Sequence, residues 1–213
     1  MKHGQLRTTG AVLLLALSMS ACAPILVASV AGSALVATDR RTSGTQLEDE
    51  TIELRASSKV RDMFGEKVHV NVTSYNRQVL LTGEVPSDKE RQAVAGIVEK
   101  VENVKSVVNE LSVMPNASLG SRSNDLVVTG KIKASLVDSR DLFANAFKVV
   151  TERNTVYLMG RVTQREADSA TQVIRNVSGV NKVVRLFEII SEEELRRLLP
   201  TPVEKTDADK AKK

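Results

Sequence analysis

The sequence predicts an α+β fold made of two tandem copies of one αββαβ unit, each with a three-stranded mixed sheet packed against two helices. The main observation is an internal repeat: VLLTGEV at residues 79–85 returns as VYLMGRV at residues 156–162, 77 positions later. Residues 101–113 likewise return at residues 177–189, now 76 positions later. The composition is 42% hydrophobic but only 3% aromatic, with no Trp, so aliphatic side chains must build the cores.

Residues 1–21 are predicted to be a lipoprotein signal peptide. Two basic residues, Lys2 and Arg7, precede an apolar run that is followed by small residues. This order is typical of a secretory signal peptide. The single cysteine, Cys22, ends the run in MSAC, which resembles a bacterial lipobox. That resemblance implies that Cys22 becomes the first mature residue and carries lipid, palmitate included. The alternative is an uncleaved membrane helix, because residues 11–37 are nearly free of charge and long enough to span a bilayer.

The residue after the cysteine bears on the destination of the protein. An Asp at this position would imply retention in the inner membrane, whereas the chain has Ala23. The lipobox resemblance therefore implies a lipid-anchored protein on the periplasmic face of the outer membrane. We expect residues 22–50 to form the lipidated N-terminal tether.

A helix is expected to begin each copy, because apolar residues recur at every fourth position. These positions are Ile52, Ala56 and Val60 in the first copy, and Val128, Ile132 and Leu136 in the second. Ser123 and Asn124 are predicted to cap the second of these helices, with Asp125 in its first turn, where the helix dipole favours an anion.

The remaining elements follow in the same order in both copies. Two strands are joined by the polar turns SYNRQ and TERNT, and the second strand ends in the VxLxGxV motif. Ser87 and Thr163 then open a second helix with one apolar face. Apolar residues alternate again over residues 107–113 and 183–189, which predicts the third strand of each copy.

These elements set the expected domain boundaries. The first domain is predicted at residues 51–114 and the second at residues 124–190, with residues 115–123 as a linker. A Ser-x-x-Glu capping box opens a C-terminal helix, which two prolines end before a disordered tail, together spanning residues 191–213. Each unit is small for an isolated core, so we expect the two units to pack on each other.

The repeat motifs resemble the BON domain. The helix end and third strand read VENVKSVVNEL in the first copy and VSGVNKVVRLF in the second, where Arg185 replaces the usual Asn. With the lipobox and the segment ATDRRTSGTQLEDETIELR, the two copies resemble the DolP/YraP family of dual BON-domain outer-membrane lipoproteins. The resemblance implies a non-enzymatic protein linked to envelope integrity and to cell division sites.

Catalytic residues, metal ligands and cofactors are not expected. The only cysteine is the predicted anchor, and His3 is lost with the signal peptide. His69 lies in the strand VHVNV, where alternation places it opposite the valines and in solvent. The glycines of the strand motif, Gly83 and Gly160, are expected to serve a turn or close packing rather than a ligand.

The charge distribution favours a lipid partner over nucleic acid. The net charge is only +4, and residues 120–190 carry eleven basic and seven acidic residues, so the excess lies in the second domain. At the bacterial envelope the available anionic surface is phospholipid, near which basic residues are stabilised. We therefore expect an anionic phospholipid membrane as partner and no nucleic acid.

The first helix of the second domain is the candidate lipid site. At about 100° per residue, its core positions share one side and a second apolar stripe lies opposite them, beside two lysines. The predicted phospholipid-binding residues are Leu126, Val127, Gly130, Lys131, Lys133 and Val137. Such a stripe is typical of an interfacial helix, and the family resemblance also implies lipid binding through this helix.

Two alternatives stay open. Leu126 and Val137 could instead pack against the first domain or the linker, or be exposed without a role. The protein could also be a periplasmic interaction scaffold, whose sheet edges and exposed stripe bind outer-membrane assembly or division machinery.

Overall fold

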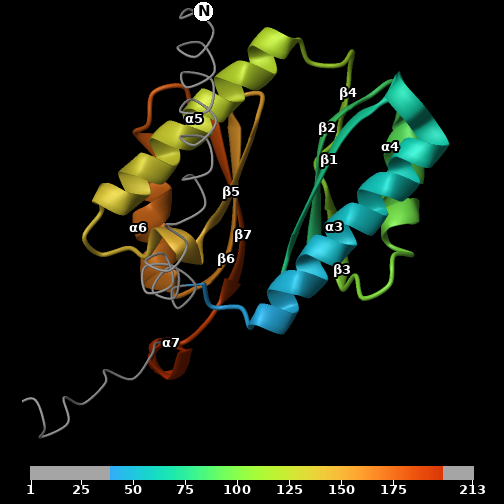
Figure 1. The fold of residues 1–213 in the computed structure, drawn as a ribbon. Coiled ribbons are helices and arrows are strands. Elements are labelled where there is room, and N and C mark those ends of the chain that lie inside the picture. The colour runs from blue at the N-terminus through green and yellow to red at the C-terminus, as the bar shows by residue number, and fades with distance from the viewer. Residues whose placement is uncertain (1–38, 199–213) are drawn as a thin grey trace, which may run out of the picture. The chain divides into compact units, whose positions relative to one another are not determined.

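The computed structural model describes residues 39–198 (Figure 1). The predicted signal peptide, Cys22, the tether up to residue 38 and the tail from residue 199 lie outside the described residues. Repeat 1 consists of α3 (Ser43–Phe64), the 3-10 turn η2 (Gly65–Lys67), β1 (His69–Tyr75), β2 (Gln78–Val85), α4 (Asp88–Val98), β3 (Ser106–Asn109) and β4 (Ser112–Val113). Repeat 2 consists of α5 (Leu119–Asp138), η3 (Ala144–Ala146), β5 (Lys148–Glu152), β6 (Thr155–Val162), α6 (Gln164–Arg175) and β7 (Lys182–Ile189), and α7 (Glu192–Leu198) follows it.

Each repeat has one mixed sheet, as the sequence predicts. In repeat 1, β2 is central, antiparallel to β1 and parallel to β3 and β4. In repeat 2, β6 is central, antiparallel to β5 and parallel to β7. Two helices cover one face of each sheet, α3 and α4 in repeat 1 and α5 and α6 in repeat 2 (Figure 1). The predicted αββαβ fold is confirmed.

The predicted core positions fill the space between helices and sheet. Ile52, Ala56 and Val60 are buried against Val79 and Leu81 of β2 in repeat 1. The matching positions of α5 are buried against β6 in repeat 2, namely Val128, Ile132 and Leu136. A residue every fourth position lies on one helix face, which is why this spacing marks the core.

The other faces of the two sheets pack against each other. A separate apolar cluster joins them, consisting of Tyr75 and Leu80 from repeat 1 and Tyr157 and Met159 from repeat 2, with flanking Val and Leu residues. This contact explains why β2 is buried almost without interruption, since side chains on both of its faces are covered. The tyrosines, two of the chain's six aromatic residues, thus serve the contact between the repeats.

The start of α5 differs from the prediction. The helix begins at Leu119 with Ser118 as its N-cap, whose hydroxyl accepts a hydrogen bond from the Ser121 N–H at 3.2 Å. Ser123 therefore lies inside the helix, and the second half of the expected linker at residues 115–123 is helical. Both serines are good N-cap residues, so local sequence does not choose between them.

The start of α3 differs in the same way. It begins at Ser43 with Thr42 as its N-cap, so the last eight residues of the expected tether, 43–50, are helical. Asp49 and Asp125, at matching positions of the repeats, are buried inside their helices, so Asp125 does not lie in the first turn as predicted. Each carboxylate accepts two backbone N–H bonds from the turn that joins the first two strands of its repeat.

These aspartates stabilise a strained turn. Asn76 and Arg77 have φ values of 51° and 68°, and Arg153 and Asn154 have 50° and 60°, in the left-handed region that non-glycine residues rarely adopt. The buried carboxylate satisfies the two N–H groups that such a turn directs inward, which offsets part of the conformational cost.

The third strand of repeat 1 is also different. The sequence predicts one strand over residues 107–113, but pairing breaks between β3 and β4. The Asn109 side chain accepts the Leu111 N–H at 3.2 Å, a local bond that competes with the sheet. Repeat 2 has Arg185 at the matching position, and there β7 is continuous.

Candidate functional site

The outer face of α5 is the first candidate site. Leu126 is 74% exposed, Val127 57% and Val137 70%. Gly130, Lys131 and Lys133 are exposed as well, so all six predicted residues point away from the core of repeat 2. The alternative in which Leu126 and Val137 pack against repeat 1 or the linker is wrong, because neither side chain is covered.

The sequence reasoning missed one member of this face. Leu119 is 80% exposed, the most exposed large apolar side chain among the described residues. It lies seven residues before Leu126 and therefore, after two helical turns, on nearly the same side of α5. Leu119 was missed because the sequence prediction began the helix at Ser123. Ser118 as the N-cap is the sequence signal that would have placed Leu119 in the helix.

The outer face of α5 also differs in charge from that of α3. From Leu126 to Val137 the chain has two lysines and no acidic residue. On α3, exposed Leu47 and Leu54 are separated by exposed Glu50, and Arg61 follows. The two repeats share a fold, but only in the second does an apolar stripe, over residues 126–137, have lysines and no acidic residue within it; exposed Asp138 follows at the end of the helix.

A groove of about 650 Å³ lies between the two repeats. The groove is lined on one side by residues 68–73, which are the residue before β1 and the first five residues of that strand, and on the other side by residues 149–151 of β5. Both strands are at the edges of their sheets, so strand edges rather than sheet faces border the groove. Leu126 also lines it, which connects the groove to the outer face of α5.

His69 is not in solvent, contrary to the prediction. Its side chain is 16% exposed and its Nδ1 lies 2.8 Å from Oε2 of the fully buried Glu84. Alternation along β1 does place His69 opposite the core valines, but that face meets repeat 2. Arg153 of repeat 2 donates to Oε1 of Glu84 at 3.0 Å, and the Ala117 N–H donates to Oε2 at 3.0 Å.

Electrostatics at this contact depend on partners from both repeats. Burial alone would raise the pKa of Glu84, but the hydrogen bonds from Ala117, His69 and Arg153 outweigh burial and lower it. The neighbouring Glu152 behaves in the opposite way: burial raises its pKa, and the charge of Glu84 adds to the increase. Asn71 donates to Oε2 of Glu152 at 2.8 Å.

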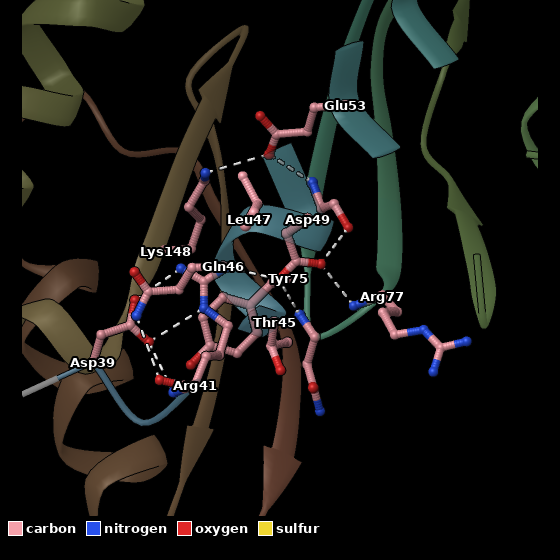
Figure 2. Close-up of polar contacts among 12 residues, drawn as sticks. Asp39, Arg41, Thr45, Gln46, Leu47, Asp49, Glu53, Tyr75, Arg77 and Lys148 are labelled. Atoms are coloured by element: carbon pink, nitrogen blue, oxygen red, sulfur yellow. Dashed lines mark hydrogen bonds and ion pairs between the residues drawn. The ribbon is translucent and has the colours of Figure 1, made fainter. Parts of the chain in front are cut away.

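The segment 39–42 fastens the start of the described chain to both repeats. In repeat 1, Arg41 donates to Oδ2 of Asp49 at 2.8 Å and its guanidinium lies 4.3 Å from the centre of the Tyr75 ring (Figure 2). In repeat 2, Arg40 forms two hydrogen bonds with Glu166, at 2.6 and 2.8 Å, and a third with the Arg161 carbonyl. We call residues 39–42 the clasp.

The charges of the clasp are satisfied internally. Burial by itself lowers the pKa of the Arg41 guanidinium, but hydrogen bonds from that group to Asp39 and Asp49 raise it above its ordinary value. Burial would raise the pKa of Glu166, yet Arg40 and the Thr163 N–H lower it. Both ion pairs therefore persist at neutral pH.

No helix within residues 39–198 is both long enough and apolar enough to cross a bilayer.

Comparison with known proteins places these features in a family. The BON domain profile matches residues 49–115 and 124–191. The chain is 36% identical over 174 residues to the outer membrane lipoprotein DolP of Haemophilus influenzae, which covers 81% of this chain and 90% of that protein. It is 32% identical over 154 residues to the 21 kDa hemolysin of Actinobacillus pleuropneumoniae, covering 71% and 79%. With the osmotically-inducible protein Y of Escherichia coli it shares 27% identity over 144 residues, covering 66% and 72%.

Proposed function

This chain belongs to the BON-domain family, among the dual-BON outer-membrane lipoproteins of the DolP/YraP group, and from that premise we propose that its second BON domain binds anionic phospholipid through α5. The proposed role is non-enzymatic: the protein supports envelope integrity, including at division sites, from the periplasmic face of the outer membrane. Lipid on Cys22, which lies outside the described residues, is the proposed anchor.

One observation carries this proposal: the outer face of α5 combines exposed apolar side chains with lysines, and the exposed acidic residue of the helix, Asp138, lies at its C-terminal end. Leu119, Leu126 and Val137 follow one line along the helix, and all three are at least 70% exposed. Lys133 is exposed beside that line, and Lys131 is exposed on a flank of the helix, about 120–140° around the axis from it. Apolar insertion below the headgroups together with attraction of basic side chains to anionic lipid is how interfacial helices bind.

The expected strength of this contact is modest. Full burial of a leucine side chain contributes about 1.5–3 kcal/mol, and each lysine near an anionic surface about 1 kcal/mol. None of the outer-face residues is aromatic, so the interfacial anchoring that Trp or Tyr gives other proteins is absent from this helix. We therefore propose that the helix orients a protein whose attachment is provided by its lipid, a two-signal arrangement.

The test is co-sedimentation of the unlipidated chain starting at Ala23 with vesicles of neutral lipid alone or with added phosphatidylglycerol or cardiolipin. We expect binding to the anionic vesicles only, and at least tenfold weaker binding when Lys131→Glu and Lys133→Glu are combined. The matched control is Lys59→Glu with Arg61→Glu, two exposed cations of α3 with the same spacing. Equal binding to neutral vesicles, or equal loss in the control, would refute the proposal.

A second candidate function is a scaffold for envelope proteins. The specific observation in its favour is the groove bordered by the edges of β1 and β5, where unpaired backbone groups could accept an extended segment of a partner. Site-specific crosslinking in cells distinguishes the two candidates. A substitution at Thr151, in the groove, would abolish a protein crosslink without changing vesicle binding if the scaffold function is correct.

A further inference from the structure

We propose that His69, Glu84 and Glu152 form a binding site for a divalent transition-metal ion of the Zn²⁺ type, at the contact between the two BON domains. Each residue offers one ligand atom, and these atoms all lie within 4.8 Å of one another. The residues come from β1, β2 and β5. Because Glu152 is 83 positions from His69 in the chain, the spacing of these residues in the sequence does not indicate a metal site.

The donor set suits such an ion. One imidazole with two carboxylates combines the ligands that Zn²⁺ takes at about 2.0–2.2 Å in three-ligand sites with one open position. Donor atoms bound to one ion at that distance lie roughly 3–3.5 Å apart. The His69 Nδ1 and Glu84 Oε2 atoms are 2.8 Å apart, a hydrogen-bond distance that an ion would open slightly, and the Glu152 carboxylate, within 4.8 Å of both, would move inward.

Hydrogen bonds hold both carboxylates in place from outside the site. Arg153 donates to Oε1 of Glu84, and the Ala117 N–H donates to Oε2, the oxygen that faces His69. Asn71 donates to Oε2 of Glu152 at 2.8 Å. Such outer partners orient metal-binding carboxylates, and loss of one typically weakens metal affinity by about 10–100-fold.

Charge and access favour a cation as well. Glu84 and Glu152 are buried near each other, and with neutral imidazole the two carboxylates exceed the single Arg153 guanidinium by one negative charge. A divalent ion would relieve the repulsion between the carboxylates. Of the three ligands, His69 lines the groove of about 650 Å³, together with Asn71, and the two carboxylates are buried behind it, so an ion would reach the site past His69.

The fold itself does not require these residues. In repeat 2 the positions matching His69 and Glu84, 77 residues later, are Ala146 and Arg161. The sheet there forms with the same strand order and the same antiparallel pairing. The BON sheet therefore forms without this pair in repeat 2, and in repeat 1 an ion held by β1, β2 and β5 would clamp the two domains together.

The test is a titration of the full-length chain in detergent, after removal of metals with EDTA, using Zn²⁺ by calorimetry and Co²⁺ by visible absorption. We expect one ion per chain, an increase in melting temperature with Zn²⁺, and Co²⁺ bands typical of nitrogen and oxygen ligands. A Cys22→Ser background removes the thiol as a competing ligand. Affinity should fall at least tenfold in His69→Ala and in Glu152→Gln.

The matched control is Glu188→Gln. Glu188 accepts a hydrogen bond from Asn76 across the same domain contact, but it lies outside the cluster, so this variant should bind the ion normally. Glu152→Gln is nearly isosteric, which keeps the test valid if His69→Ala weakens the fold. The proposal would be overturned if no stoichiometric binding is seen at 100 µM Zn²⁺, a dissociation constant that corresponds to a binding free energy of about 5.5 kcal/mol. It would also be overturned if both variants bind Zn²⁺ with unchanged affinity. Either result would mean that the three residues form a hydrogen-bonded contact only.

Discussion

Arg40 and Glu166, 126 positions apart, form a buried bidentate ion pair that attaches the clasp to the second BON domain. The two N–O distances are 2.6 and 2.8 Å, and both side chains are at most 2% exposed. Glu166 also completes the capping box of α6 with Thr163. Residues 39–42, which lie within the predicted tether and precede α3 of repeat 1, are thus joined to the domain that carries the outer face of α5.

We predict that Glu166→Gln lowers the free energy of unfolding by about 3 kcal/mol, because removal of one partner leaves the Arg40 charge buried without compensation. Urea unfolding followed by circular dichroism measures the change. The control is Glu194→Gln, which removes the partially exposed ion pair with Arg161 at 2.6 Å and should cost less than about 1 kcal/mol. If both variants lost the same free energy of unfolding, the prediction that the buried Arg40–Glu166 pair contributes more than an exposed ion pair would be contradicted.

The pH dependence of stability should contain two opposite contributions. The pKa of Glu166 is lowered in the folded state from 4.5, so its contribution is present above pH 4.5 and is lost as the pH falls through the folded value. The pKa of Glu152 is raised from 4.5, so its contribution is present below pH 4.5 and is lost as the pH rises through the folded value. Glu152→Gln should therefore stabilise the EDTA-treated protein at pH 7 but not at pH 3.5. Urea midpoints at the two pH values test this, and a uniform shift at both would contradict it.

Leu126→Asp should weaken binding to anionic vesicles at least tenfold, because a carboxylate at the centre of the outer face opposes insertion and repels the lipid charge. Leu54→Asp on α3 is the matched control, since Leu54 is exposed to the same 74% and its loss should leave binding unchanged. Leu119→Asp should weaken binding to a lesser extent. Flotation of vesicles with bound protein gives the three affinities. A larger loss of binding in Leu54→Asp than in Leu126→Asp would contradict the prediction, because it would place the lipid contact on the first domain.

The glycines of the two domains should respond oppositely to alanine. A Cβ on Gly83 would lie 2.1 Å from the His69 carbonyl oxygen, and its φ of +112° already disfavours other residues, so Gly83→Ala should cost about 2 kcal/mol or more. A Cβ on Gly130 meets nothing within 4 Å, so Gly130→Ala in the middle of α5 should stabilise by about 0.5–1 kcal/mol. Thermal unfolding of both variants checks the two signs.

Much of the fold could be predicted because the repeat presents the same local patterns twice. Four-residue spacing in the first helices identified Ile52 and Val128 as core residues, and comparison of the two copies separated them from the exposed Leu126. The helix starts were predicted wrongly because several Ser and Thr residues near each start are adequate caps. Tertiary contacts of Asp49 and Asp125 decide how far each helix extends.

The sequence by itself determined the elements, their order, the helix face that fills each core and the charge of the outer face of α5, because these depend on periodicity and composition along one segment. Only the tertiary structure decided that the sheets pack face to face, that Arg40 reaches Glu166, and that His69 lies between two carboxylates instead of in water. The reason is physical: alternation shows that a strand has two faces, but whether the second face meets solvent or another domain depends on side chains more than 80 residues away, as with Asn71 and Glu152.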